Sequence, residues 1–329
     1  MPSAQPPVTW DRAWHDAALS AAIAELAESR LRPVATILAE CRDRPEVRSL
    51  RVAVLADRLV GRGRGILELA EDNDNPDLLV LAGTIFVREA LVIAGDVPTA
   101  ELPRGRAAVA LSYLRKAAAP LNKAAAALPK DAVPVDHLQL VGSLLEVDRG
   151  RVDSVWAESQ RRCPTLFSAH RNRLAVLAAR EDQSEMLAFA RGCVDRARSG
   201  DPRLSLIASA HLEVARRLGR VAKDATWKER QAAFSARYDH LARTSPAVAE
   251  VGRAAERWLR GPGGHPFALE IHNVFAAVFA QAGQTELARP HLRAIGTRLT
   301  PVWAMVEGEP LYRKALKRHL RAERVPPGV

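Results

Sequence analysis

Apolar residues recur at helical spacing along almost the whole chain. In residues 11–30, for example, Trp14, Leu19, Ile23 and Leu26 fall on one side of a helix. No stretch shows the sustained alternation of apolar and polar residues that a half-buried strand requires. The same spacing predicts further helices at residues 34–41, 45–60, 77–94, 103–128, 135–147, 152–162, 165–179, 184–198, 203–218, 224–243, 247–259, 267–282, 286–295 and 310–323. The pattern therefore predicts an all-α protein.

Proline residues mark several of the expected helix starts. They are Pro45, Pro76, Pro129, Pro164, Pro202 and Pro246. Three of the intervals between them, 31, 35 and 38 residues, lie near the tetratricopeptide period of about 34 residues. The best single match flanks Gly283, where Ala276 and Ala288 take small positions and Phe279 and Leu292 take bulky ones. We predict a tetratricopeptide-like helical-repeat α-solenoid of about 14–16 helices, with a compact helical bundle as the alternative.

Breaks in the pattern predict how the chain is divided. We expect a flexible N-terminus at residues 1–10, a helical-repeat array at 11–260 and a Gly-rich break at 261–264. Residues 265–323 then form a repeat-like helical pair plus a basic capping helix, and residues 324–329 form a flexible tail. The last helix is basic on one side and apolar on the other, as a cap over a solenoid end requires. A helix that lies on a membrane surface has the same pattern and is the alternative.

Trp303 lies in the connector that precedes this last helix. A tryptophan side chain can bury on the order of 200 Å² of surface, so it is rarely left in water. We expect Trp303 to pack against Phe275 or Phe279 and to close the end of the hydrophobic core. The alternative is that it lines a ligand groove.

Composition supports the helical prediction, and it also affects how the positive net charge is interpreted. Hydrophobic residues make up 48% of the 329 residues and aromatic residues only 5%, while 59 residues are Ala, a strong helix former. The formal net charge is +10, and 41 of the 48 basic residues are Arg, which is typical of a chain encoded by a GC-rich genome. Because the basic residues are dispersed among acidic ones, we expect that nucleic acid is not the partner.

Cysteine and histidine spacing excludes the common disulfide and metal frameworks. Cys41, Cys163 and Cys193 lie far apart, and no CxxC, HxxxH or HExxH motif occurs. We expect free thiols, no metal and no cofactor in a cytoplasmic protein. The N-terminus lacks the basic and apolar regions of a signal peptide, and no apolar run is long enough to span a bilayer.

Several spaced motifs resemble those of a known family. They are Trp10-Asp11, Trp156-Ala157-Glu158, Arg162-Cys163-Pro164, Ala169-His170-Arg171, the run from Ser184 to Arg191, and the segment from Phe275 through Ile295-Gly296 to Pro301-Val302-Trp303. With these motifs the chain resembles a bacterial helical family known as domain of unknown function 4034. The family pattern has a His between the Ser and the Glu of the run that begins at Ser184, where this chain has none. The resemblance implies a tetratricopeptide-like helical fold and no particular chemistry.

One group of residues could share a groove if the helices stack as repeats. It comprises Trp156, His170, Arg171, Arg173 and Glu185, on successive expected helices. Arg side chains bind carboxylates, and repeat arrays present concave surfaces to peptides. We therefore hypothesise a non-catalytic protein- or peptide-binding module that favours an acidic partner segment. One alternative is an enzyme or small-molecule binder with a pocket between helices around Trp156, His170, Arg173 and Glu185, with His170 and Glu185 in acid–base roles. Another is that these side chains form a hydrogen-bond network between helices.

Overall fold

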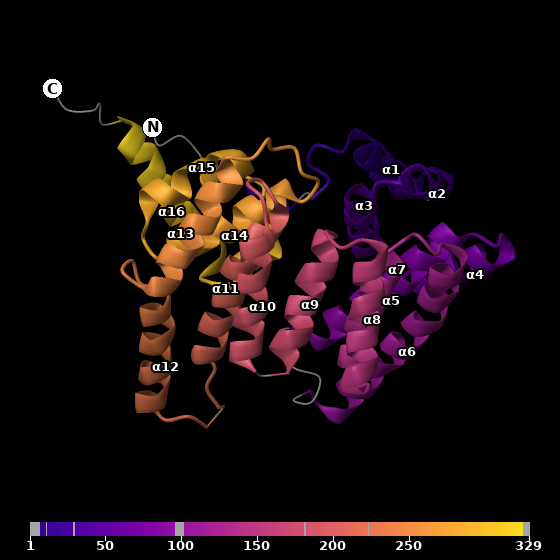
Figure 1. The fold of residues 1–329 in the computed structure, drawn as a ribbon, viewed down its shortest axis with the longest axis horizontal. Coiled ribbons are helices and arrows are strands. Elements are labelled where there is room, and N and C mark those ends of the chain that lie inside the picture. The colour runs from indigo at the N-terminus through magenta and orange to yellow at the C-terminus, as the bar shows by residue number, and fades with distance from the viewer. Residues whose placement is uncertain are drawn as a thin grey trace. The chain divides into compact units, whose positions relative to one another are not determined.

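The computed structural model of the chain is built from α-helices (Figure 1). It describes residues 7–10, 12–28, 30–95, 102–180, 182–222 and 224–324, with the backbone alone for 320–324. Across these residues there are sixteen α-helices, and the only extended pairing is an isolated bridge between Thr9 and Arg298. The prediction of an all-α protein is confirmed, whereas the tetratricopeptide-like arrangement stays a prediction. None of the described helices combines the length and the apolar character that a membrane crossing demands.

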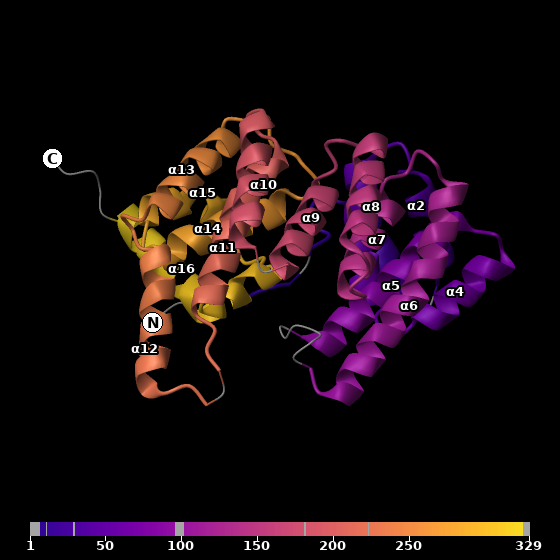
Figure 2. The ribbon, with the colours of Figure 1, turned by 60° about the horizontal axis from the view of Figure 1, so that its bottom comes forward.

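The chain divides into two compact units (Figures 1 and 2). The N-terminal unit comprises residues 13–181, and the C-terminal unit comprises residues 182–329 together with residues 1–12. The N-terminal unit contains α1 (Ala17–Ala27), α2 (Arg32–Ala39), α3 (Pro45–Arg58), α4 (Gly63–Asp72), α5 (Pro76–Ala94), α6 (Arg104–Ala127), α7 (Val133–Leu144), α8 (Arg149–Arg162) and α9 (Phe167–Ala179). The C-terminal unit contains α10 (Gln183–Arg196), η2 (Pro202–Ser205), α11 (Leu206–Leu218), α12 (Trp227–His240), α13 (Pro246–Leu259), α14 (Ala268–Gln281), α15 (Thr285–Ile295), η3 (Pro301–Met305) and α16 (Gly308–Arg324).

Local capping signals start several of these helices at the positions that the sequence indicates. The side chains of Asn75 and Ser245 accept hydrogen bonds from backbone N–H groups of the first turn. Pro76 and Pro246 follow directly, where the missing N–H of proline costs no hydrogen bond. In α6 the helix continues through Pro120, so the proline does not end it.

The core of the N-terminal unit lies around α5, which buries residues on all sides. Phe86 of α5 packs in one cluster with Ala117 and Leu121 of α6 and Val141 of α7. A β-carbon added at Gly83 would lie only 2.5 Å from Cγ of Leu121. Glycine at this position therefore allows α5 and α6 to approach closely.

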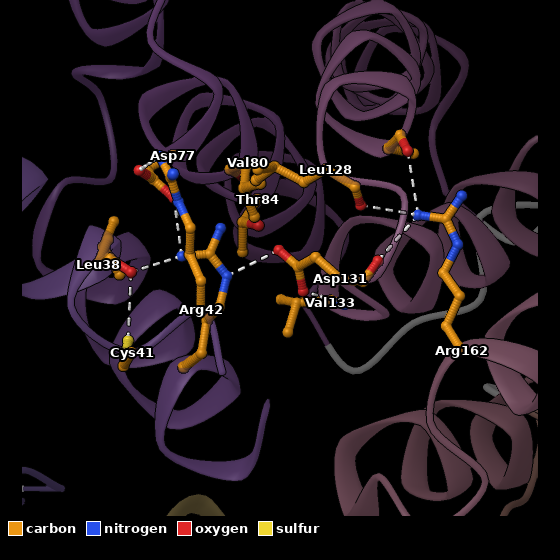
Figure 3. Close-up of polar contacts among 12 residues, drawn as sticks. Leu38, Cys41, Arg42, Asp77, Val80, Thr84, Leu128, Asp131, Val133 and Arg162 are labelled. Carbon is orange, nitrogen blue, oxygen red and sulfur yellow. Dashed lines mark hydrogen bonds and ion pairs between the residues drawn. The ribbon is translucent and has the colours of Figure 1, made fainter. Parts of the chain in front are cut away.

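Buried ion pairs connect several helices of the same unit (Figure 3). Arg48 of α3 donates from Nε to a carboxylate oxygen of Asp131 at 2.7 Å, and its Nη1 lies 2.9 Å from Asp77. Arg42 also pairs with Asp77, and Arg162 of α8 donates to the backbone carbonyl of Asp131 at 2.9 Å. Removing Arg48 would leave the buried carboxylate of Asp131 without its ion pair. The network therefore fixes how α3, α5 and α8 meet.

Trp303 lies in the core of the C-terminal unit, as predicted. It is fully buried, and its Nε1 donates to the Asn273 side-chain oxygen of α14 at 2.7 Å. The aromatic ring that it meets edge-on is Tyr312 of α16, whereas we expected Phe275 or Phe279. Both α14 and α16 therefore contribute to the burial of this tryptophan.

The Gly-rich break expected at residues 261–264 lies inside the C-terminal unit. A β-carbon on Gly261 would lie 2.1 Å from Cα of Gly200, so the two backbones touch at this point. The Gly200 N–H also donates to the carbonyl of Arg257 at 3.1 Å. These glycines join the α10–α11 and α13–α14 connections. The two compact units meet in the sequence between residues 181 and 182.

Candidate functional site

α9 carries an unusual number of buried polar side chains. Ser168, His170, Asn172 and Arg173 are all less than about a tenth exposed, although they point to different sides of the helix. Buried polar groups are normally hydrogen-bonded, because leaving one unpaired costs about 1–3 kcal/mol. The contacts of α9 therefore show what these residues do in the fold.

On one side of α9, two of these side chains bind a buried carboxylate. The Ser168 hydroxyl donates to Asp136 of α7 at 2.6 Å, and the Asn172 amide donates to its other oxygen at 2.8 Å. Burial raises the pKa of Asp136 to about 6, although the two hydrogen bonds and the charge of Arg171 oppose the shift. Asp136 was not singled out from the sequence, where a single acid in an apolar helix gave no indication of its burial.

On another side of α9, three residues of the predicted site come together. The His170 and Trp156 rings meet edge-on with centroids 5.1 Å apart, and the Arg173 guanidinium lies 5.8 Å from the Trp156 ring centre. His170 Nδ1 lies 2.9 Å from the carbonyl oxygen of Leu166, which can only accept a hydrogen bond, so Nδ1 carries the proton. The expectation that α8 and α9 direct these residues toward one another is therefore correct for Trp156, His170 and Arg173.

The charge of Arg173 is already paired within the unit. Its Nη1 donates to Asp153 of α8 at 2.7 Å, and Arg180 donates to the same oxygen at 2.9 Å. Burial alone would raise the pKa of Asp153, but the bonds from Arg180 and Arg173 hold it below its ordinary value. This ion pair ties α8 to α9. Sequence reasoning missed Asp153, although it lies three residues before Trp156 and so on the same helix face.

Arg171, also on α9, makes a separate contact. The Arg171 guanidinium lies over the ring of Phe167, with its carbon 6.0 Å from the ring centre. Glu185 belongs to α10 in the C-terminal unit, so the predicted set is divided between the two units. The N-terminal unit alone assembles an aromatic, imidazole and ion-paired cluster between α8 and α9.

Histidine side chains of the C-terminal unit form short contacts with one another. His272 and His291 lie 2.9 Å apart through their Nδ1 atoms, and burial lowers their pKa values to about 4 and about 3. His211 contacts His240 at 3.2 Å. In the part of the chain that the structure describes, no three His, Cys, Asp or Glu side chains lie close enough to hold a metal ion.

Three of the large exposed apolar side chains of the C-terminal unit lie on α12. Trp227 is 75% exposed, Phe234 is 54% exposed and Tyr238 is 38% exposed. Their spacing of seven and four residues places them on one side of the helix. The Phe234 and Tyr238 rings also contact each other, with centroids 4.7 Å apart. We call these three residues the α12 aromatic face.

α12 forms without burying any of its own residues. Its N-terminus is closed by a capping box, in which the Glu229 N–H donates to the Thr226 hydroxyl and the Thr226 N–H donates to the Glu229 carboxylate. At its C-terminal end Tyr238 donates to Glu307, and Arg237 donates to the carbonyl of Met305 at 3.0 Å. In both ribbon views α12 stands at the edge of its unit beside α11 (Figures 1 and 2).

Comparison with protein-family models, with curated proteins and with solved structures found no match for this chain. The resemblance to domain of unknown function 4034 therefore stays a prediction. Function has to be argued from the surfaces and contacts of the chain itself.

Proposed function

We propose that the chain is a non-catalytic module that binds a protein or peptide, and that the partner lies on the α12 aromatic face. The observation that supports this most is the exposure of Trp227, Phe234 and Tyr238 on one helix side. Contiguous exposed aromatic residues are typical of interaction sites, and Trp and Tyr are frequent among residues that dominate binding energy. A partner helix that covers this row would bury all three rings.

The residues beside this row favour an acidic partner. On the helical wheel Arg230 and Arg237 run along one side of the aromatic face, and Lys228 lies on the other. Glu229 points away, where its carboxylate closes the capping box. The N-terminal end of a helix also carries partial positive charge. We therefore assign the occupant as an amphipathic helical segment with acidic residues flanking its apolar row.

Two acids at the other end of α12 refine this assignment. Asp239 lies near the C-terminal end of the helix, and Glu307 accepts the hydrogen bond of Tyr238. The positive surface is therefore strongest around Trp227, and the acidic residues of the partner should lie there. Oppositely charged surfaces of this kind accelerate association and make it sensitive to salt.

The direct test is binding of a designed peptide to the full chain. The probe is a fluorescein-labelled amphipathic helix with Leu at positions i, i+3, i+4 and i+7 and Glu on both flanks, and its matched counterpart carries Lys in place of Glu. We expect the Glu peptide to bind more tightly and to weaken with salt. The double substitution Trp227→Ala and Phe234→Ala should lower the affinity at least about tenfold. Fluorescence anisotropy measures both effects.

Val92→Ala is the matched control, because Val92 is an exposed apolar residue (62%) on α5, outside the proposed surface. This variant should bind like the wild type. Failure of the Glu peptide to bind, or equal affinity for the wild type and the Trp227/Phe234 variant, would refute the proposal.

The alternative of a small-molecule or catalytic site at Trp156, His170, Arg173 and Glu185 has less support. Arg173 is paired with Asp153, and its side chain is only 10% exposed. The ring contact of Trp156 with His170 and the ion pair of Arg173 with Asp153 both join α8 to α9.

A further inference from the structure

His211 links α12 to the rest of the C-terminal unit. It lies on α11 and is almost fully buried, with its Nδ1 3.2 Å from Nε2 of His240, the last residue of α12. Its Nε2 lies 3.0 Å from a carboxylate oxygen of Glu250 on α13. Glu250 is held in turn by Arg191 of α10, through two hydrogen bonds of 2.8 and 3.0 Å. Four helices therefore meet in one row of polar contacts.

The chemistry of the row fixes where its protons lie at neutral pH. A carboxylate can only accept hydrogen bonds, so His211 must donate from Nε2 to Glu250. A neutral imidazole carries one proton, which leaves the Nδ1 of His211 as an acceptor. His240 must therefore donate from Nε2 to His211. In this state both rings are neutral and α12 is attached to α11 through one hydrogen bond between them.

This contact matters because α12 has few other attachments. No residue of α12 itself is buried, and the helix packs mainly against α11. Other side-chain bonds near its C-terminal end join Tyr238 to Glu307 and to Gln281, Arg237 to the Met305 carbonyl, and Ser245 to the His240 carbonyl. An element with little buried surface opens at low free energy, so one lost contact changes how often it opens.

We infer that the His211–His240 pair is an acid-sensitive latch that keeps α12 docked and so regulates the α12 aromatic face. The regulatory part rests on the proposed function of that face. A first proton is tolerated, because a charged His211 still donates to Glu250 and can donate from Nδ1 to an unprotonated Nε2 of His240. A second proton, on His240, places two N–H groups and two positive charges against each other. The contact then breaks.

The surrounding charges determine the direction of the pH response. The groups that face the pair are Glu250 from α13 and Arg191 from α10. Burial lowers the pKa of His211, although Glu250 opposes the shift, and burial followed by the charge of His211 lowers the pKa of His240. Glu250 stays ionised, because Arg191 above all holds its pKa at about 2. A histidine whose pKa is lower in the docked state favours docking at pH values above its unfolded pKa, which is about 6.5. As the pH falls below about 6.5, this contribution to docking is lost.

The test is hydrogen exchange of the full chain without any peptide. Protection factors of the α12 amides, corrected for intrinsic exchange, are compared between about pH 7.5 and about pH 5, with the α13 amides as the internal reference. We expect α12 protection to fall roughly tenfold or more relative to α13 in acid. His240→Gln should abolish this fall, because the Gln amide can either donate to or accept from His211 by turning over, and it never becomes charged.

His265→Gln is the matched control, since it removes a buried histidine of the same unit outside the row and should keep the wild-type response. Unchanged α12 protection in acid, or an equal fall in His240→Gln, would overturn the latch.

The anisotropy assay with the Glu peptide is then run at both pH values. Peptide affinity that falls in the wild type but not in His240→Gln supports regulation, and an equal response in both proteins refutes it. If the peptide fails to bind even at about pH 7.5, the proposed function fails, while the exchange result still decides whether the latch exists.

Discussion

Replacing Asp136 by Asn removes a buried charge while keeping both of its hydrogen bonds. Asp136 accepts from the Ser168 hydroxyl and from the Asn172 amide. An Asn side chain at this position would still accept from Asn172 through its oxygen, and its NH₂ group would donate to the Ser168 hydroxyl. The substitution therefore isolates the cost of the negative charge from the loss of the contacts.

The size of the effect follows from the raised pKa. Burial moves the pKa of Asp136 from 3.8 to about 6, a shift of roughly two units at about 1.4 kcal/mol each, which gives about 3 kcal/mol. A carboxyl group whose pKa is raised by folding binds its proton more tightly in the folded state. Its contribution to the free energy of unfolding is therefore fully present below about pH 3.8 and is lost as the pH rises through about 6.

We expect Asp136→Asn to gain stability relative to the wild type as the pH rises, reaching an advantage of up to about 3 kcal/mol near pH 8. The assay is urea unfolding of the full chain at a series of pH values, with the opening of α7 and α9 followed by hydrogen exchange of their peptides. His137 is also buried, and burial lowers its pKa to about 3, which gives a pH dependence of opposite sign. That contribution is common to both proteins and cancels in the difference.

Asp153→Asn is the matched control with the opposite expectation. The bonds from Arg180 and Arg173 lower the pKa of Asp153, so its charged form stabilises the folded state above the unfolded value and is lost in acid. This variant should be less stable than the wild type at neutral pH and should approach it in acid. A stability difference between Asp136→Asn and the wild type that does not change with pH would refute the reasoning about the buried charge.

Two further predictions concern packing. Gly83→Ala places a methyl group 2.5 Å from Leu121 and should cost about 1–3 kcal/mol in unfolding experiments, whereas Gly105→Ala in α6 meets nothing within 4 Å and should be neutral or slightly stabilising. Equal stability of the two variants would contradict the close approach of α5 and α6. Trp303→Ala should cost roughly 3–5 kcal/mol and lower the melting temperature markedly, while Trp227→Ala should leave stability nearly unchanged. A stable Trp303→Ala protein would show that Trp303 is not part of the core.

Most of the helices could be predicted from the sequence because their determinants are local, whereas α4 (Gly63–Asp72) was not among the expected helices. Asn75 followed by Pro76, and Ser245 followed by Pro246, act within one helical turn. The division of the chain could not be predicted, because it depends on contacts between distant segments. Thr9 pairs with residues 297 and 299 near the other end of the chain, and this contact includes the N-terminal residues in the C-terminal unit.

The candidate site was partly predictable for the same reason. Trp156, His170 and Arg173 lie on α8 and α9, which are successive helices, so helical spacing was enough to bring them together. Spacing does not show which charges are paired, and Arg173 was expected to attract an external acid. The acid that it binds is Asp153, on the neighbouring helix of the same unit.

Helical periodicity identifies the residues that share a side of α12, but not which side packs. Trp227, Phe234 and Tyr238 have the spacing of a core-facing row, which normally points inward. In the structure the half-buried residues of α12 include two small ones on the other side, Ala233 and Ala236, together with Arg237 and His240. Small residues allow a close approach between helices, so α12 can pack through them and leave its aromatic rings in solvent. A helix that packs through alanines and polar contacts and exposes its aromatic residues has the apolar surface of an interface, and this reversal is the reason for assigning a partner to it.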